Sequence, residues 1–373
     1  MSDLIENTRL CSVCFKMCRD ACSVAAATRH EADSPHNRGF FAYRIMQGKA
    51  DLNKETVEYF YRCSMCKACR EACETGLDTS ESMLSARSGL DDSLLPATVL
   101  ARKGDIITGK IYSTDSDEVS SILKPYILKN GANTLVYFGQ RLRALGADTI
   151  RSTANVFDKL AVEFSVLPEE PDTGQLAYFL GFSRDAAALA KKFKEMVESC
   201  APKTLVIMSA DDLRMVKLEF PKLGLDIRNI EIVSLPEFLL AVLKEKKPVL
   251  SRLGAKRVTY HDPCGLGREL RQFEAPREII GMVPGIKLVE MAFSRDQAPC
   301  CGYGSGLEIS HPEVMREMAS RLVSIAADAD ADVLVTGCPT CRSILMENVK
   351  DSGKSGHYPE ILDIPILLEK VLQ

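Results

Sequence analysis

The spacing of cysteine residues constrains this 373-residue chain more than any other feature of its sequence. There are 14 cysteines, and all but Cys200 fall into three groups. The chain opens with a polar segment that carries Asp3 and Glu6. This segment is unlike a signal peptide, so we expect reduced thiols in a cytoplasmic protein. A core of this size does not need disulfides. Thiols grouped in this way therefore predict metal ligation.

Composition excludes several classes of protein. Hydrophobic residues make up 46% and charged residues 26%, which is typical of a globular chain. The net charge of -4 gives no reason to expect a nucleic-acid partner. The apolar runs are far shorter than the roughly 20 residues that a membrane span needs. We therefore expect no direct membrane insertion, and any membrane association would run through partner subunits.

The first two cysteine groups lie in the segments CSVCFKMCRDAC and CSMCKACREAC. The second matches the C-x2-C-x2-C-x3-C spacing of bacterial ferredoxins, whereas the first has one extra residue. In such runs three thiolates hold one cluster and the fourth reaches the other cluster. We therefore expect two [4Fe-4S] cubane clusters with exchanged ligands, one on Cys11, Cys14, Cys18 and Cys73 and the other on Cys63, Cys66, Cys69 and Cys22.

Two structural zinc sites are the alternative interpretation, but zinc usually takes two cysteine pairs separated by a longer loop. Ser23 and Glu74 stand where proline normally follows the fourth cysteine. With the extra residue, this leaves open whether the first site is a complete cubane. The stretches 56–62 and 79–89 have helical patterns and few strands are indicated before about residue 130, so residues 1–95 are predicted to form an α-helical ferredoxin domain.

Beyond residue 130, short buried strands alternate with helices, which predicts an α/β fold. The predicted strands are 134–138, 204–208, 257–260 and 332–336, and helical patterns cover 184–198 and 312–328. The segment LVIM at 205–208 recurs as LVTG at 334–337, and the same interval separates Pro236 from Pro365. Residues 130–250 and 251–373 are therefore predicted to be two copies of one unit.

The two predicted copies differ in their cysteines. The second has Cys264, the adjacent pair Cys300 and Cys301, and the pair Cys338 and Cys341. The first copy has other residues at the corresponding positions: Gln140, Asp172, Thr173, Gly174, Ser209 and Asp212. Loops at the carboxyl ends of parallel strands converge, and five thiolates exceed what one tetrahedral zinc takes. We expect one metal site in the second copy, with Asp172 and Asp212 as solvated loop residues rather than cation ligands.

The segments YHDPC-x-LGR and GCPTC, with the adjacent cysteine pair, resemble the cysteine-rich CCG domain found in the B-type and D-type subunits of heterodisulfide reductase. With the N-terminal ferredoxin motifs, the order resembles the D type and the iron–sulfur subunits of glycolate oxidase and anaerobic glycerol-3-phosphate dehydrogenase. The resemblance implies an α-helical ferredoxin domain followed by an α/β tandem-repeat CCG domain. It also implies a non-cubane four-iron cluster on Cys264, Cys300, Cys301, Cys338 and Cys341.

The expected function is electron transfer from the two cubanes to the CCG cluster within a multi-subunit oxidoreductase. No nucleotide-binding motif is present, so a flavoprotein or another redox subunit would supply hydride chemistry. One alternative is a heterodisulfide reductase that cleaves a thiol-derived S–S bond at Cys300 and Cys301, with His261 donating a proton. Another is a zinc-stabilised assembly protein. Because the first copy lacks the cysteine ligands, electron transfer is favoured over cleavage of a disulfide.

Other residues are weaker candidates. His261 fits a turn-capping role as well as a proton donor. Arg268 and Arg342 follow Cys264 and Cys341 and would offset cluster charge, bind an anionic substrate, or be ordinary surface arginines. His30 and His36 lie in a charged stretch that we expect to be exposed, and Cys200 is expected to be a structural thiol.

Overall fold

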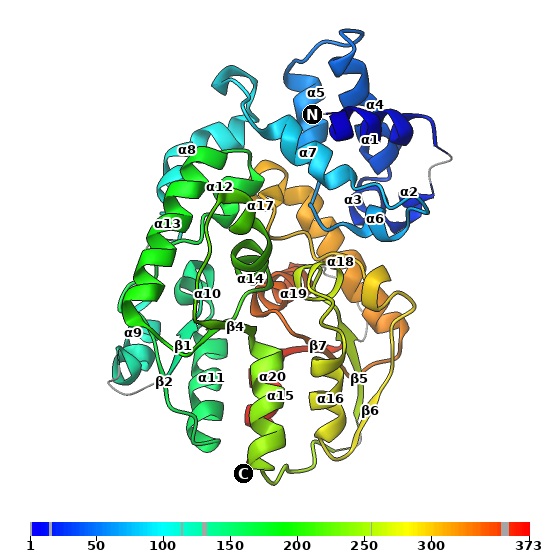
Figure 1. The fold of residues 1–373 in the computed structure, drawn as a ribbon. Coiled ribbons are helices and arrows are strands. Elements are labelled where there is room, and N and C mark those ends of the chain that lie inside the picture. The colour runs from blue at the N-terminus through cyan, green and yellow to red at the C-terminus, as the bar shows by residue number, and fades with distance from the viewer. Residues whose placement is uncertain (1, 15–16, 113–114, 129–132, 255, 352–357) are drawn as a thin grey trace.

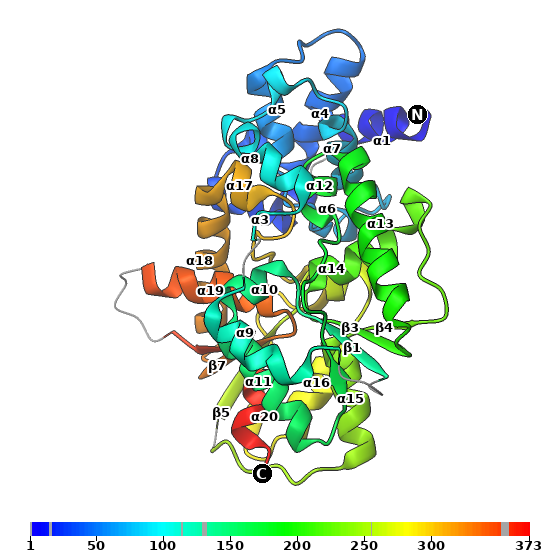
Figure 2. The same ribbon diagram turned by 90° about the vertical axis from the view of Figure 1, so that its left-hand side faces the viewer.

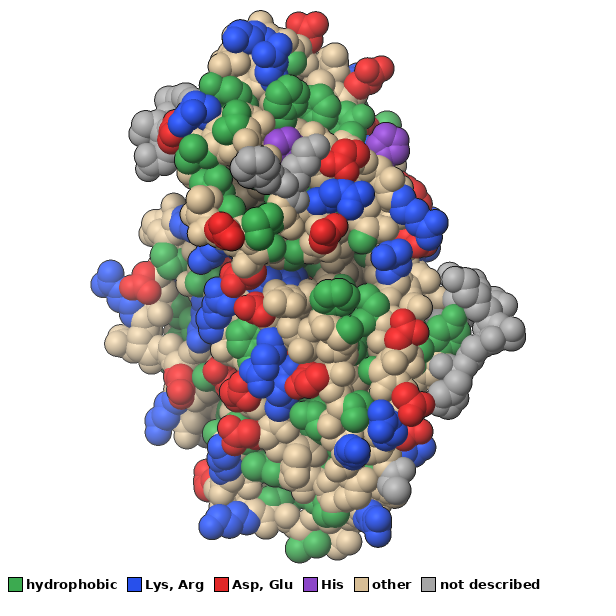
Figure 3. Space-filling model, turned by 90° about the vertical axis from the view of Figure 1, so that its right-hand side faces the viewer, with side chains coloured by type: hydrophobic (Ala, Val, Ile, Leu, Met, Phe, Trp, Pro, Cys, Tyr) green, Lys and Arg blue, Asp and Glu red, His purple; other side chains and the backbone are tan. Residues whose placement is uncertain are grey.

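The structure is a computed structural model that describes residues 2–14, 17–112, 115–128, 133–254, 256–351 and 358–373. A helical N-terminal part sits at one end of two parallel sheets and their helices (Figure 1). Acidic and basic side chains are interspersed over the face shown in Figure 3. No helix within these described ranges is both long and apolar enough to cross a bilayer.

The N-terminal part is built from helices, and no strand precedes residue 134 among the described residues. Helix α4 starts where Ser34 Oγ accepts a hydrogen bond from the Asn37 backbone N–H, with Pro35 in the first turn. Helix α5 starts with a reciprocal cap between Asn53 and Thr56. The elements are α1 (Ser2–Ser12), α2 (Cys18–Ala21), α3 (Ser23–Thr28), η1 (Glu31–Asp33), α4 (Pro35–Met46), α5 (Lys54–Tyr61), α6 (Ala68–Glu71), α7 (Thr79–Arg87) and η2 (Asp92–Leu94). The helices predicted at 56–62 and 79–89 are confirmed as α5 and α7.

The first sheet has the order β2-β1-β3-β4, and all its strands are parallel. Its strands are β1 (Thr134–Tyr137), β2 (Phe164–Ser165), β3 (Thr204–Ile207) and β4 (Glu231–Ser234). The helical elements before and around it are α8 (Ala97–Thr108), α9 (Asp117–Leu123), η3 (Lys124–Tyr126), α10 (Gln140–Leu145), α11 (Ala147–Lys159), α12 (Gln175–Phe179), α13 (Ser183–Cys200), α14 (Ala210–Arg214), η4 (Met215–Glu219), η5 (Pro221–Leu223) and α15 (Leu235–Lys246).

The second sheet has the order β6-β5-β7-β8 and is also parallel. Its strands are β5 (Lys256–His261), β6 (Ile286–Leu288), β7 (Val333–Thr336) and β8 (Glu360–Asp363). The helical elements around it are η6 (Gly265–Glu269), α16 (Glu274–Met282), η7 (Arg295–Gln297), α17 (Leu307–Ser310), α18 (Pro312–Asp328), α19 (Pro339–Asp351) and α20 (Ile364–Val371). The helices predicted at 184–198 and 312–328 are confirmed as α13 and α18.

The four predicted strands are confirmed, and they are the central strands of the two sheets: β1, β3, β5 and β7. The sequence analysis missed the edge strands β2, β4, β6 and β8. Central strands of a parallel sheet are buried on both faces and read as apolar runs. The edge strands β4 and β6 are partly exposed, and β2 has only two residues, so their sequences carry little strand signal.

Two apolar cores hold these parts together. One core lies between the sheets and contains Val136, Val206, Val258 and Val335. The other joins the N-terminal helices to both sheets and contains Phe60, Leu180 and Met318 among others. Helix α3 packs against α18, which places the N-terminal cysteine runs over the second sheet's helices (Figure 2).

Candidate iron–sulfur sites

The structure brings the two N-terminal cysteine runs together. Cys18, at the start of α2, has Cys11, Cys14 and Cys73 as close electrostatic neighbours, and also Cys22. Cys69, in α6, has Cys63, Cys66 and Cys22 as such neighbours. The fourth cysteine of each run therefore faces the three leading cysteines of the other run. The ferredoxin-like spacing predicts an exchange of ligands of this kind.

Burial shapes the chemistry of these thiols. It raises the pKa of Cys18 to about 12, with neighbouring cysteines acting in the same direction. Burial also raises the pKa of Cys63, whereas the nearby cations Arg38 and Arg87 act to lower it. Free thiols at these positions are protonated at neutral pH, so a bound metal would have to displace their protons.

The five C-terminal cysteines meet at the carboxyl ends of the central strands of the second sheet. Cys264 follows β5, Cys338 lies between β7 and α19, and Cys341 lies in the first turn of α19. Cys300 and Cys301 belong to the loop between η7 and α17. All five are buried, and Cys301 Sγ lies 3.3 Å from Cys341 Sγ. Cys300 is in hydrogen-bonding contact with Cys264 and Cys301, and Cys341 with Cys338.

Irregular backbone makes this convergence possible. Gly302 has a φ of +94°, a conformation that a side chain disfavours, and the Gly302 N–H donates to Cys300 Sγ at 3.3 Å. The Ala210 N–H, at the start of α14, donates to Cys338 Sγ at 3.3 Å. The first sheet's helix α14 thus forms part of the wall around the second sheet's thiols.

The second N-terminal run and the C-terminal thiols adjoin one another. Cys66 is in hydrogen-bonding contact with Cys300. The Cys300 N–H donates to Ser23 Oγ at 2.9 Å. Arg268 Nε donates to the Cys66 carbonyl at 2.6 Å, and Arg268 Nη1 donates to the Ala298 carbonyl. These bonds tie the two groups of thiols into one buried region.

The donor set fits iron–sulfur clusters. Thiolates are the ligands that such clusters take, and N–H groups that donate to sulfur are part of their usual surroundings. Arg38, Arg87 and Arg268 are at most 2% exposed and lie beside these thiols. Buried cations need nearby negative charge, which thiolate-ligated iron would provide. No three described Cys, His, Asp or Glu side chains already surround a single metal position. A cluster instead spreads its thiolates over several iron atoms.

His261 is fully buried, and both of its ring nitrogens have protein partners. Nε2 lies 3.1 Å from the Pro299 carbonyl, and Nδ1 lies 3.2 Å from Thr336 Oγ1. A carbonyl only accepts, so Nε2 carries the proton and Nδ1 accepts from the threonine hydroxyl. Burial lowers the pKa of His261. This geometry favours a neutral histidine that positions the loop before Cys300 over a proton donor.

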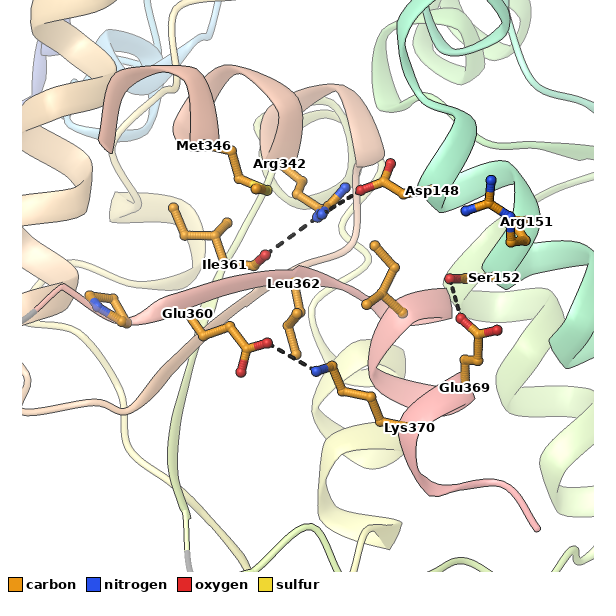
Figure 4. A pocket seen from close by; sticks show the side chains of 12 residues that line it. Asp148, Arg151, Ser152, Arg342, Met346, Glu360, Ile361, Leu362, Glu369 and Lys370 are labelled. Atoms are coloured by element: carbon orange, nitrogen blue, oxygen red, sulfur yellow. Dashed lines mark hydrogen bonds and ion pairs between the residues drawn. The ribbon is translucent and has the colours of Figure 1, made fainter. Parts of the chain in front are cut away.

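Several weaker candidates lie elsewhere than expected. Arg342 does not face the thiols, because its guanidinium pairs with Asp148 at 2.7 Å. It lines a cavity of about 490 Å³ between α11, β8 and α20 (Figure 4).

His36 is 8% exposed, so its expected exposure is wrong, whereas His30 is exposed as expected. His36 is buried because α4 turns that face toward the protein interior. Cys200 ends α13 and packs against the core.

Asp172 and Asp212 are half-buried rather than fully solvated, so the expectation that they are solvated is only partly correct. Burial raises the pKa of Asp172 to about 6. Asp212 accepts a hydrogen bond from Thr173 Oγ1 at 2.6 Å, and burial raises its pKa as well. Both are partly shielded because the strand ends of the first sheet face the rest of the protein.

Sequence analysis missed several charged residues around the thiols. Lys67 and Arg214 both pair with the buried Glu269, at 3.1 and 3.0 Å. This network joins the second N-terminal run to helical elements of both sheets. Arg38 and Arg87 were missed too. Only Lys67, inside a cysteine run, carried a local signal; the others reach the site through contacts between distant segments.

Comparisons with known proteins agree with this architecture. The 4Fe-4S dicluster domain family matches residues 7–77, and the Cysteine-rich domain family, CCG, matches residues 258–346. The chain is 27% identical to the D-type subunit of dihydromethanophenazine:CoB–CoM heterodisulfide reductase from Methanosarcina acetivorans, over 99% of this chain and 94% of that protein. The B-type subunit of fumarate reductase (CoM/CoB) from Methanothermobacter marburgensis is 29% identical, over 43% of this chain and 32% of its own length.

A hypothetical protein from Helicobacter pylori has a similar fold, with a TM-score of 0.56 and 12% identity. The match covers 89% of this chain and 66% of that one. The sequence comparisons extend beyond fold, because they include both cysteine-bearing regions in the same order. The chain is therefore similar to D-type subunits of heterodisulfide reductase, with a region that matches the 4Fe-4S dicluster domain family before a region that matches the cysteine-rich CCG family.

Proposed function

We propose that this chain is an electron-transfer subunit of a multi-subunit oxidoreductase. It relays electrons through two [4Fe-4S] cubanes to a non-cubane [4Fe-4S] cluster in the CCG domain. The first cluster is held by Cys11, Cys14, Cys18 and Cys73, the second by Cys63, Cys66, Cys69 and Cys22, and the third by Cys264, Cys300, Cys301, Cys338 and Cys341. When bound, such clusters supply one-electron oxidation and reduction.

The contact between Cys66 and Cys300 carries the proposal. If both cysteines bind iron as proposed, a ligand of the second cluster lies against a ligand of the third. Ser23 and Arg268 fix this contact from both sides through backbone hydrogen bonds. The surrounding residues are buried, so the protein excludes water between the two groups. Electron transfer between them then needs no movement of the chain.

The proposal includes a division of the chain into residues 1–95, 130–250 and 251–373, with 130–250 a degenerate CCG repeat. The shared strand order supports a common origin for the last two units, since β2-β1-β3-β4 corresponds to β6-β5-β7-β8 in chain order. Ser209 follows β3 as Cys338 follows β7, which fits the loss of a thiol. The degenerate unit contributes packing and the Ala210 N–H.

Cleavage of a disulfide at the CCG cluster is the second candidate. A cavity that reaches Tyr303 and Thr340, next to Cys301 and Cys341, favours it. That cavity measures only about 50 Å³, whereas small-molecule sites usually need about 300 Å³ or more. The size therefore favours the relay. In the relay, redox subunits such as a flavoprotein supply the substrate chemistry, and any membrane association of this cytoplasmic chain runs through them.

Metal analysis of anaerobically purified protein tests the proposal first. We expect about twelve irons per chain with matching acid-labile sulfide. Zinc without sulfide would contradict the proposal and support an assembly protein.

A variant then tests the third site. In Cys301→Ala we expect a loss of about four irons, while Cys200→Ala, which removes a thiol outside the three groups, keeps the full content. Electron paramagnetic resonance (EPR) with and without added disulfide separates the two candidates. A relay gives no signal that depends on the disulfide, whereas a new signal that Cys301→Ala abolishes would favour cleavage.

A further inference from the structure

Arg38 is a buried cation beside the second cluster. It is 2% exposed, and its Nη1 lies 3.9 Å from Cys22 Sγ in a hydrogen bond to the sulfur. Its other donors go to the carbonyls of Tyr59 and Arg62, at 3.1 and 3.4 Å. Asp33 is within electrostatic reach but forms its ion pair with Arg62. The charge of Arg38 therefore acts mainly on the thiols.

Arg87 reaches the same cluster from α7. It is 1% exposed, and its Nη2 donates to the Cys63 carbonyl at 2.6 Å. Every hydrogen bond described for its guanidinium ends on a backbone carbonyl, including those of Phe179 and Ser305. Within the described part of the chain, neither Arg38 nor Arg87 forms an ion pair with a carboxylate.

Arg268 lies where the second and third clusters adjoin. Its Nε donates to the Cys66 carbonyl at 2.6 Å, and its Nη2 is buried with no hydrogen-bond partner among the residues that the structure describes. As thiolates, Cys66, Cys264 and Cys300 would be the negative groups that act most strongly on it. Three guanidinium groups thus lie beside cysteines proposed to hold the second cluster, and Arg268 also lies beside cysteines proposed to hold the third.

The first cluster has different surroundings. Apart from burial, the charges that act most strongly on Cys18 are those of other cysteines. Arg9 and Arg19, the arginines nearest its run in sequence, are about half exposed and paired with Glu6 and Glu31. Exposed pairs of this kind are screened by water and salt.

A positive charge stabilises the reduced form of a cluster, because reduction adds one negative charge. Net charge, hydrogen bonding and solvent exposure set the potential of such clusters. We propose that Arg38, Arg87 and Arg268 hold the second cluster at a higher reduction potential than the first, and so direct electrons from the first run toward the CCG domain. This inference rests on the proposed function. One electron leaves the first cluster and enters the second, and no proton moves.

Three features act in the opposite direction, and one is Asp78, whose carboxylate is within electrostatic reach of Cys69 although it pairs with Lys67 at 3.4 Å. Cys14 is exposed, and Cys73 accepts backbone hydrogen bonds, so water and N–H dipoles also stabilise reduction of the first cluster. Dipoles are weaker than full charges, and a charge acts more strongly across buried protein than across water. The three guanidinium groups are therefore expected to dominate.

A redox titration of the anaerobic holoprotein, followed by EPR, tests the inference. The two cubane signals should have different midpoints, with the second cluster higher. Cys11→Ser assigns the signals, since an oxygen ligand alters the signal of the first cluster only. In Arg38→Met, the ratio of reduced to oxidised second cluster at a fixed potential should fall at least tenfold. A tenfold change is 59 mV for a one-electron couple.

Matched variants separate the effect of the Arg38 charge on the midpoint from any structural effect of the substitution. Arg38→Lys keeps the charge and should restore most of the midpoint. Arg44→Met removes an arginine from the same helix α4 and should shift neither signal. Arg268→Met provides a second test at another position if Arg38→Met does not assemble its clusters, and it should also lower the second midpoint.

The outcomes distinguish this inference from the function on which it rests. Absence of EPR-active clusters in the wild-type protein would overturn both. Assembled clusters in which the first has the higher midpoint would overturn the inference alone. Unchanged midpoints in Arg38→Met and Arg268→Met with intact clusters would do the same.

Discussion

Buried arginines in this chain have two kinds of partner. Arg38, Arg87 and Arg268 bind carbonyls beside thiols, whereas Arg277 binds carboxylates. Arg277 forms two hydrogen bonds with Asp262, at 2.7 and 2.8 Å, and further bonds with Glu290. The Asp262 side chain is 1% exposed and lies two residues before Cys264. The difference follows from the negative groups nearby: Asp262 and Glu290 compensate the charge of Arg277, whereas thiolate-ligated iron would compensate the charges of the other three arginines.

Removing Arg277 should be costly. In Arg277→Gln, Asp262 remains as a buried charge without its partner, which typically costs about 3–5 kcal/mol. Denaturant unfolding followed by circular dichroism measures the loss. The exposed pair of Lys370 and Glu360 provides the control, since Lys370→Gln should cost less than about 1 kcal/mol. Equal losses in the two variants would contradict this account.

His311 should give stability a pH dependence. Burial, with help from Arg62 and Arg87, lowers its pKa to about 4, against about 6.5 in an unfolded chain. The neutral ring donates from Nε2 to Glu58 at 2.8 Å. Between these two pKa values the unfolded chain binds the proton and the folded chain does not. The contribution of His311 to the free energy of unfolding is therefore complete above pH 6.5 and is lost as the pH falls toward 4, by an amount on the order of 3 kcal/mol.

Anaerobic thermal unfolding between pH 7.5 and 5 measures this effect. His311→Gln should flatten the dependence in the acidic part of that range. His30→Gln, at an exposed histidine, should leave it as in the wild-type protein. An identical slope in His311→Gln would show that other groups cause the dependence.

At the scale of elements, the loop between η7 and α17 determines whether the third site can form. Cys300 and Cys301 can both face the site only because the backbone after them turns through positive φ at Gly302, Gly304 and Gly306. Helix α18 packs directly against this loop. A Cβ at Gly302 would lie 3.0 Å from Met315 Cγ and 3.1 Å from Met315 Cα.

Gly302→Ala should therefore displace the loop. We expect it to lose the third cluster, about four irons per chain, while the two N-terminal EPR signals remain. Gly281→Ala in α16 is the control, because a Cβ there meets nothing within 4 Å. Full iron content in Gly302→Ala would mean that the loop tolerates the shift.

At the scale of the whole molecule, the N-terminal helices and the sheets share buried contacts. Tyr61 is 0% exposed, and its hydroxyl donates to the Leu180 carbonyl at 2.9 Å. Ser310 Oγ donates to the Tyr61 carbonyl at 3.2 Å, and Arg87 bonds to Phe179 and Ser305. An interface this well packed and hydrogen-bonded favours cooperative unfolding of the parts it joins.

We expect the visible absorbance of the clusters and the far-ultraviolet circular dichroism to disappear in one thermal transition. Tyr61→Phe should lower the free energy of unfolding by about 1–2 kcal/mol, because the Leu180 carbonyl loses its partner, and both midpoints should fall together. Tyr43→Phe, at a partly exposed tyrosine of α4, should have little effect. Loss of absorbance well before the loss of helix signal would show that the N-terminal part separates first.

The sequence by itself determined the features that depend on local spacing. The ferredoxin-like runs, the five C-terminal cysteines, the helices α5, α7, α13 and α18, and the central strands β1, β3, β5 and β7 all leave a regular pattern along the chain. A thiol that ligates metal needs neighbours at fixed intervals, and a strand buried on both faces needs a continuous apolar run. Both requirements are visible without coordinates.

Only the tertiary structure decided which distant residues share a buried environment. The edge strands form because a central strand offers hydrogen bonds, so their own sequences carry little signal. The burial of His36 and the partial burial of Asp172 come from packing between segments far apart in sequence. The contacts that take Arg342 away from the thiols, and those that bring Arg38 and Arg87 toward them, have the same origin. The same packing placed Cys66 against Cys300. No local pattern encodes these contacts, because they arise from the way helices and sheets cover one another.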